Sequence, residues 1–127
     1  MAIPVTALFG AIHGVLNVAL AIGVTRARAQ SNIFLGTGDN ESLLLASRRH
    51  GNNTEYVPLA LLLLLVAELA GGGATALYAL GTALTVGRVL HAIGVGSEPS
   101  PLRAIGAVLT WVAIVGAGIY GLLASMH

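Results

Sequence analysis

The chain has 127 residues, of which 56% are hydrophobic and only 9% are charged, and its mean hydropathy is +0.87. A water-soluble domain of this length does not need so many apolar side chains for one core, so the composition predicts a membrane protein. The formal net charge of +1 leaves no basic surface for nucleic acid. The absence of cysteine excludes disulfides, thiolate-bound zinc and a cysteine nucleophile.

Four apolar stretches have the length needed to cross a bilayer, whose hydrocarbon core of about 30 Å takes roughly 20 helical residues. They predict an all-α fold, a four-helix transmembrane bundle with up-and-down connections, in a single domain over residues 1–127. The expected helices cover residues 3–24, 40–70, 74–93 and 104–124. We expect the first to be retained, because no basic residue precedes it as a secretory signal requires.

All six residues in the Lys and Arg count are arginine, and up-and-down connections place them toward one membrane face. They are Arg26, Arg28, Arg48, Arg49, Arg88 and Arg103. The positive-inside rule makes that face cytoplasmic and puts both termini outside. Small residues four positions apart, such as Gly10 with Gly14 and Ala113 with Ala117, predict close helix packing and favour self-association.

A polar segment precedes the apolar part of the second helix. Four of its residues fall on one helix face over about 10 Å. They are Arg48, Asn52, Glu55 and Tyr56. A guanidinium, an amide, a carboxylate and a phenol complement a ligand of tripeptide size that carries carboxylates, peptide groups and an amine. Contact with lipid headgroups is the alternative for Arg48 and Glu55, and it is the favoured interpretation for Arg49. Pro58 predicts a kink beside this cluster.

Arg88 and His91 lie three residues apart on the third helix, at the depth of Glu55. An arginine inside a span faces the bundle interior and needs a partner, for which Glu55 is the nearest candidate. No second histidine lies at metal-ligand spacing from His91, so we predict no metal site. His13 and Asn17, on the first helix, are expected to form hydrogen bonds between helices.

The polar residues occur in an ordered pattern. It reads Arg48-x-His50-x-Asn52-x-x-Glu55-Tyr56-x-Pro58, preceded by Gly36-Thr37-Gly38-Asp39 and followed by Gly87-Arg88-x-x-His91-x-x-Gly94. This pattern resembles the MAPEG family, the membrane-associated proteins in eicosanoid and glutathione metabolism. Members are four-helix membrane proteins that assemble as trimers and bind glutathione between subunits. The resemblance covers nearly the whole chain and is closest to the short bacterial branch, so it implies a homotrimer in a bacterial inner membrane.

The resemblance also implies roles for individual residues. Glutathione would be held by Arg48, Asn52, Glu55 and Tyr56, and Arg88 would support the pocket or contact the ligand. His91 is expected to be one of the binding residues. At positions 91 and 95 this sequence has His91 and Val95, whereas the eukaryotic glutathione enzymes of the family tend to carry tyrosines there. Arg26 or Arg28 would reach in from a neighbouring subunit. Arg103 matches the arginine assigned to stabilising the glutathione thiolate and is the expected catalytic residue, with a role as cytoplasmic topology anchor as the alternative.

The leading hypothesis is a glutathione transferase-like enzyme, in which glutathione as co-substrate attacks a hydrophobic electrophile dissolved in the membrane lipid. The alternative is a catalytically silent scaffold or small-molecule-binding protein of the same fold. A third hypothesis is a proton-driven exporter with Glu68 as the coupling carboxylate. Glu68 is expected about 20 Å from Glu55 along the helix, near the opposite membrane surface rather than at mid-membrane.

Overall fold

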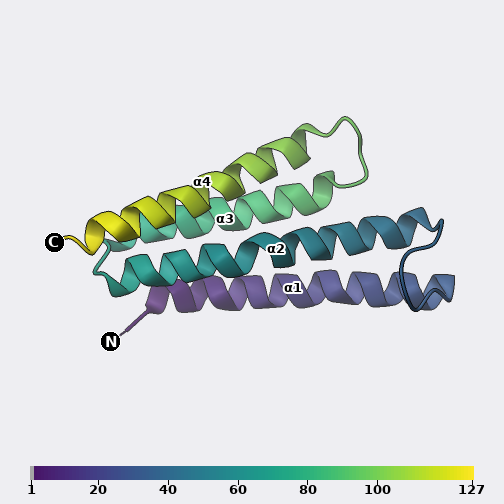
Figure 1. Cartoon of the computed structure of the whole chain (residues 1–127), viewed down its shortest axis with the longest axis horizontal. Helices are drawn as coiled ribbons and strands as arrows, with labels where there is room; N and C mark the ends of the chain where they lie inside the picture. The colour runs from purple at the N-terminus through teal and green to yellow at the C-terminus, as the bar shows by residue number, and fades with distance from the viewer. Residues whose placement is uncertain (1) are drawn as a thin grey trace.

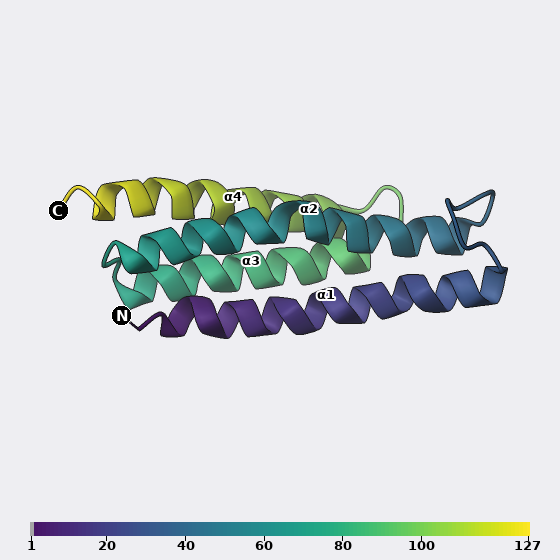
Figure 2. The same ribbon diagram turned by 60° about the horizontal axis from the view of Figure 1, so that its bottom comes forward.

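Residues 2–127, which the computed structural model describes, form four helices joined up and down (Figure 1). The helices are α1 (Pro4–Ser31), α2 (Glu41–Leu69), α3 (Ala74–Gly94) and α4 (Pro101–Ala124). The two chain ends and the turn between α2 and α3 lie at one end of the bundle, and the other two loops lie at the opposite end (Figures 1 and 2). The predicted all-α four-helix bundle is confirmed.

The helices differ in length. α1 and α2 have 28 and 29 residues, or about 42 Å each, whereas α3 has 21 residues and about 32 Å. The two long helices therefore project past α3 and α4 at the loop end (Figures 1 and 2). Within the described chain, α1, α3 and α4 are long and apolar enough to span a membrane, and α2 packs lengthwise against all three.

The expected end of the first helix at residue 24 is wrong. α1 continues through Arg26 and Arg28 to Ser31, because alternating arginine and alanine residues are good helix formers even outside the apolar stretch. It ends where Asn32 adopts a left-handed conformation, with φ of 56°. α4 likewise begins before residue 104, because the Ser100 hydroxyl caps it by accepting a hydrogen bond from the Arg103 backbone N–H at 3.2 Å.

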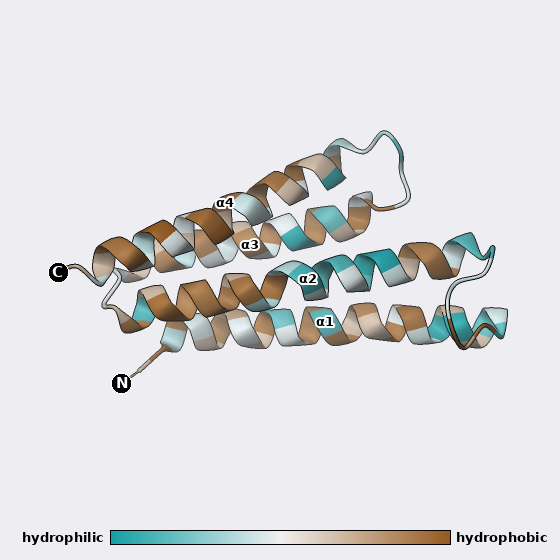
Figure 3. Ribbon diagram, in the orientation of Figure 1, coloured by the Kyte–Doolittle hydropathy of each residue, from teal (hydrophilic) through white to brown (hydrophobic). Residues whose placement is uncertain are grey.

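Hydrophilic residues are concentrated in the half of the bundle toward the loop end, whereas the half near the chain ends is mostly hydrophobic (Figure 3). The half near the chain ends contains an apolar cluster built from Val5, Phe9, Leu64, Ala67 and Leu77. Toward the loop end, three polar side chains of α2 and α3 are buried, namely Asn53, Arg88 and His91, together with the apolar side chains of Leu43 and Val95. The bundle is therefore held by apolar packing at one end, while its other end supplies polar groups to the interior.

Glu68 connects the end of α2 to the start of α1. Its carboxylate oxygens accept hydrogen bonds from the backbone N–H groups of Val5 at 2.9 Å and Thr6 at 2.7 Å. These N–H groups have no partner within their own helix and carry partial positive charge, so a carboxylate stabilises the helix start. Glu68 thus lies at the membrane end expected for it, and its role is that of a helix cap.

Glycines let α3 and α4 approach closely. A Cβ atom at Gly87 would lie 2.9 Å from the carbonyl oxygen of Gly106, and one at Gly106 would lie 2.5 Å from the carbonyl oxygen of Gly87. Gly94 lies in the same way against the backbone of Arg103. Side chains at these positions would separate the helices. The absence of side chains here brings the start of α4, with Arg103, beside the end of α3.

The placement of all six arginines toward the loop end predicts that this end is cytoplasmic. Because the chain has no cysteine, single cysteines can report orientation, and Asp39→Cys and Met126→Cys are exposed sites at opposite ends. In spheroplasts, a membrane-impermeant maleimide should label Met126→Cys at once and Asp39→Cys only after permeabilisation. Immediate labelling of Asp39→Cys alone would show the reverse orientation.

Candidate functional site

Arg88 is the centre of the buried polar cluster and is only 1% exposed. Its Nη2 donates a hydrogen bond to Oδ1 of Asn52 at 2.7 Å and lies 3.3 Å from Nδ1 of His91. Its Nε donates to Oδ1 of Asn53 at 3.3 Å, and its guanidinium carbon lies 5.8 Å from the ring centroid of Tyr56. The arginine is therefore held by neutral groups, which accept hydrogen bonds from its Nε and Nη2 without cancelling its charge.

The expected ion pair between Arg88 and Glu55 is wrong. Across residues 2–127 the structure has one ion pair, which joins Arg103 to Glu98. The residues of α2 that face Arg88 are Asn52, Asn53 and Tyr56, and at 3.6 residues per turn Glu55 points about 100° away from the middle of that face. Glu55 is exposed on the surface of the chain.

The cluster continues from Asn53 to α1. Asn53 is 1% exposed, and its Nδ2 donates a hydrogen bond to Oδ1 of Asn17 at 3.3 Å. The Thr54 hydroxyl donates to the same oxygen at 3.3 Å. On α1, Nε2 of His13 lies 3.2 Å from the hydroxyl of Thr85 on α3. The hydrogen bonds between helices expected of His13 and Asn17 are confirmed.

Two adjoining pockets lie beside Arg88. The first, of about 470 Å³, lies between α2, α3 and α4 and is lined by Asn52, Tyr56, Arg88, His91, Arg103 and Trp111, among others. The second, of about 650 Å³, lies nearer the loop end and adds Arg48. Both are lined by Asn52, His91, Glu98 and Arg103, so together they form one cleft. We refer to these two pockets as the polar cleft.

The structure brings most of the expected site residues together and leaves three outside. The polar cleft is lined by Arg48, Asn52, Tyr56, Arg88, His91 and Arg103. Glu55 and Arg26 are exposed outside it. Arg28 is committed to its own loop, since its Nη1 donates to the carbonyl oxygens of Ile33 at 3.1 Å and Gly36 at 2.9 Å. Of the two arginines at the end of α1, Arg26 is thus the one left free among the described residues.

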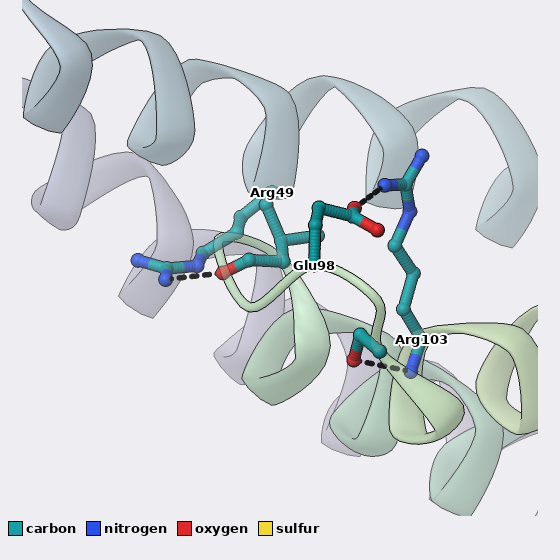
Figure 4. Close-up of polar contacts among 5 residues, drawn as sticks. Arg49, Glu98 and Arg103 are labelled. Atoms are coloured by element: carbon teal, nitrogen blue, oxygen red, sulfur yellow. Dashed lines mark hydrogen bonds and ion pairs between the residues drawn. The ribbon is translucent and has the colours of Figure 1, made fainter.

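Two polar residues have roles that the sequence did not predict, and both are shown in Figure 4. Glu98, in the loop before α4, forms its ion pair with Arg103 at the mouth of the polar cleft. Arg49 donates from Nε to the carbonyl oxygen of Ala92 at 3.0 Å and from Nη2 to that of Val95 at 2.7 Å. The expectation that Arg49 faces lipid headgroups is therefore wrong. The last carbonyl groups of a helix have no hydrogen-bond donors within that helix, and Arg49 supplies such donors at the end of α3.

Three arginines and two carboxylates, those of Glu41 and Glu98, line the polar cleft, so its formal charge is positive. Arg88 lines it with a buried charge, and its Nη1 makes no hydrogen bond to any residue from 2 to 127, so those donors remain unused. Arg103 lies in the first turn of α4, where the helix dipole adds positive potential. Guanidinium, amide and phenol donors suit an organic anion. Within the described part of the chain, no group of three or more His, Cys, Asp or Glu residues could hold a metal ion.

Comparison with known proteins identifies the family. The MAPEG family model matches residues 6–123, which is nearly the whole chain. The chain belongs to the MAPEG family. This MAPEG protein is also similar to the inner membrane protein YecN of Escherichia coli, in strains K12 and O6:H1 (CFT073), with 32% identity over 111 residues that cover 87% of this chain and 85% of the relative. No solved structure matches. The resemblance inferred from the polar pattern is confirmed, and the protein is an integral membrane protein.

The bond from Arg88 to Asn53 predicts how substitutions at residue 53 act. Asn53→Leu removes the acceptor of a charged, buried donor and should destabilise the fold by about 1.5 to 3 kcal/mol. Asn53→Asp keeps an acceptor for Arg88 and should stay closer to the parent. Thermal unfolding in detergent measures both.

A matched control is Ser47→Ala, also on α2. The Ser47 hydroxyl is buried with no hydrogen-bond partner in the described chain, so its removal should be neutral or stabilising. If the Asn53→Leu protein unfolds at the same temperature as the parent, the hydrogen bond between Asn53 and Arg88 does not stabilise the fold.

Proposed function

We propose that this MAPEG protein binds glutathione in the polar cleft and conjugates its thiol to a hydrophobic electrophile dissolved in the membrane. The observation that supports the proposal best is the convergence of Arg48, Arg88 and Arg103 on one cleft. Glutathione carries two carboxylates, two peptide groups, an amine and a thiol. Arginine is the side chain best suited to bind carboxylates in a partly dry site.

The remaining lining groups complement the rest of the tripeptide. The Asn52 amide and the Tyr56 phenol can pair with peptide groups, and both are already oriented by Arg88. His91 is oriented by the same guanidinium, through its Nδ1. Groups held in place before the ligand arrives lose less conformational entropy on binding, so this arrangement favours affinity.

We infer that three chains assemble around shared sites in a bacterial inner membrane, as the MAPEG resemblance implies. Glu55 supports this inference, because it is exposed only one helical turn before the apolar residue Leu59. A carboxylate facing lipid there is costly, and a neighbouring subunit removes that cost. Across such an interface, Glu55 can bind the ligand amine and Arg26 can reach a neighbour's cleft. The relatives named as inner membrane proteins support the location.

The nucleophile in this proposal belongs to the ligand, because the chain has no cysteine. A free thiol has a pKa of about 8.5, so only a few per cent is thiolate at pH 7. Arg103 and the start of α4 together favour an anion, and lowering the pKa of the bound thiol by two units requires about 2.7 kcal/mol. The thiolate then attacks the electrophilic carbon, forming a carbon–sulfur bond while the leaving group departs with its electron pair.

A silent small-molecule-binding protein is the second candidate function, and the Glu98–Arg103 ion pair favours it. In the structure, the carboxylate of Glu98 is paired with the guanidinium of Arg103, which the proposed catalysis requires. Because both side chains are more than half exposed, the pair is weak and a ligand anion can displace it. Turnover therefore depends on that displacement, whereas binding through Arg48 and Arg88 does not.

Removing either proposed charge contact should weaken binding. Arg48→Ala and Glu55→Ala each delete a charge-assisted hydrogen bond worth about 1.5 to 3 kcal/mol, which corresponds to roughly a tenfold to hundredfold loss of glutathione affinity. Isothermal titration in detergent measures the loss. Asp39→Ala, in the exposed loop before α2, is the control and should bind like the parent. Native mass spectrometry should show three subunits in each protein; variants that remain trimers and bind as tightly as the parent would contradict the assignment.

Arg103→Ala tests the chemistry separately from binding. We expect glutathione affinity to be retained, while the ultraviolet absorbance of the bound thiolate and the conjugation rate both fall, because the positive charge beside the sulfur is lost. Glu98→Gln is the opposite control, since it frees Arg103 and should preserve or raise the thiolate signal. Parent-level thiolate and turnover in Arg103→Ala would refute the catalytic role. A parent that binds glutathione without conjugating any electrophile would support the binding function.

A further inference from the structure

The loop between α1 and α2 carries two adjacent apolar side chains that nothing in the described chain covers. Phe34 is 77% exposed and Leu35 is 91% exposed. Exposed apolar side chains on the helices are expected in a membrane protein, where they contact lipid or a neighbouring subunit, but these two lie in the loop at the arginine-bearing end (Figure 3). A pair of large, uncovered apolar residues in a loop marks a contact site.

The backbone of this loop is held in a defined shape. Nη1 of Arg28 bonds the carbonyl oxygens of Ile33 and Gly36, which flank the two exposed residues. Asn32, Gly36 and Gly38 have φ values of 56°, 68° and 50°, which turn the chain sharply on both sides. As a result the loop turns back toward the bundle instead of extending away from it: it crosses the last turns of α1 in the view of Figure 3 and lies at the start of α2 in Figure 2.

The fold-back sets the depth of the two side chains in the membrane. The apolar stretch of α1 ends at Val24, and Arg28, which holds the loop, lies four residues further on, or about 6 Å. The headgroup region extends roughly 5 to 8 Å beyond the hydrocarbon core on each side. Phe34 and Leu35 are therefore held at the level of the headgroups, within reach of the upper acyl chains.

The charges around the loop match this environment. Arg26 is exposed on the same end of α1, and Arg28 lies directly under the loop. A bacterial or cytoplasmic leaflet carries anionic headgroups, which attract basic residues close to the surface. Apolar side chains flanked by arginine are the combination found in segments that lie in a membrane interface.

We propose that Phe34 and Leu35 form an interfacial anchor that inserts into the lipid surface on the arginine-bearing side of the membrane. The anchor ties the projecting ends of α1 and α2 to the bilayer and so fixes the depth of this end of the bundle. It is independent of glutathione binding, because none of its residues lines the polar cleft.

Depth-dependent fluorescence quenching tests the anchor. Phe34→Trp and Leu35→Trp are made in a Trp111→Phe background, which removes the chain's one native tryptophan, and the full chain is reconstituted in phosphatidylcholine–phosphatidylglycerol vesicles. The expected result is a blue-shifted emission that lipids brominated near the glycerol quench more strongly than lipids brominated near the chain end. Asp39→Trp, an exposed position in the same loop, is the matched control and should emit as in water without quenching.

Two results would overturn the proposal. Emission typical of water with no quenching by either lipid would place the loop in solvent. Blue-shifted emission without quenching would mean that another copy of the chain covers the two residues. All three tryptophans are placed at exposed positions in the loop, so the helical content of each variant, measured by circular dichroism, should equal that of the parent.

Discussion

The burial of one guanidinium inside a membrane-spanning bundle constrains the rest of this structure. Arg88 is 1% exposed, and an unpaired charge at that depth is too costly to persist unless polar groups surround it. Asn52, Asn53, His91 and Tyr56 surround it, and they come from two helices. This requirement fixes the rotation of α2 relative to α3. Because all four partners are neutral, the positive charge remains available to an anion in the adjoining cleft.

The bundle separates stability from chemistry along its length. At the end that holds the chain termini, apolar packing is supplemented by Glu68, whose carboxylate caps α1. At the loop end, the interior contains the polar side chains of Asn53, Arg88 and His91 and opens into the polar cleft. The glycine contacts between α3 and α4 also lie toward the loop end, where they hold Arg103 against the end of α3. The polar cleft at the loop end is therefore separate from the apolar cluster that stabilises the opposite end.

The six arginines are chemically identical, yet the structure divides them among different tasks. Arg28 and Arg49 bond backbone carbonyl groups and hold a loop and a helix end in place. Arg48, Arg88 and Arg103 line the polar cleft. A guanidinium has five donors in a planar fork, which makes it equally suited to fastening carbonyl groups and to binding carboxylates. The placement of all six arginines at one end is the basis for predicting that this end is cytoplasmic, but it does not define what each of them does there.

The amino-acid sequence by itself determined the four helices, their up-and-down order and the family, because apolar length and the spacing of polar residues are local properties. Six of the nine residues that the sequence assigned to the site also line the polar cleft. Only the tertiary structure decided that Arg88 pairs with amides instead of Glu55, and that Glu98 holds Arg103. These choices depend on the rotation of α2 about its axis and on the path of the loop before α4. Neither is encoded in a repeat along one helix, since both are set by how separate helices pack.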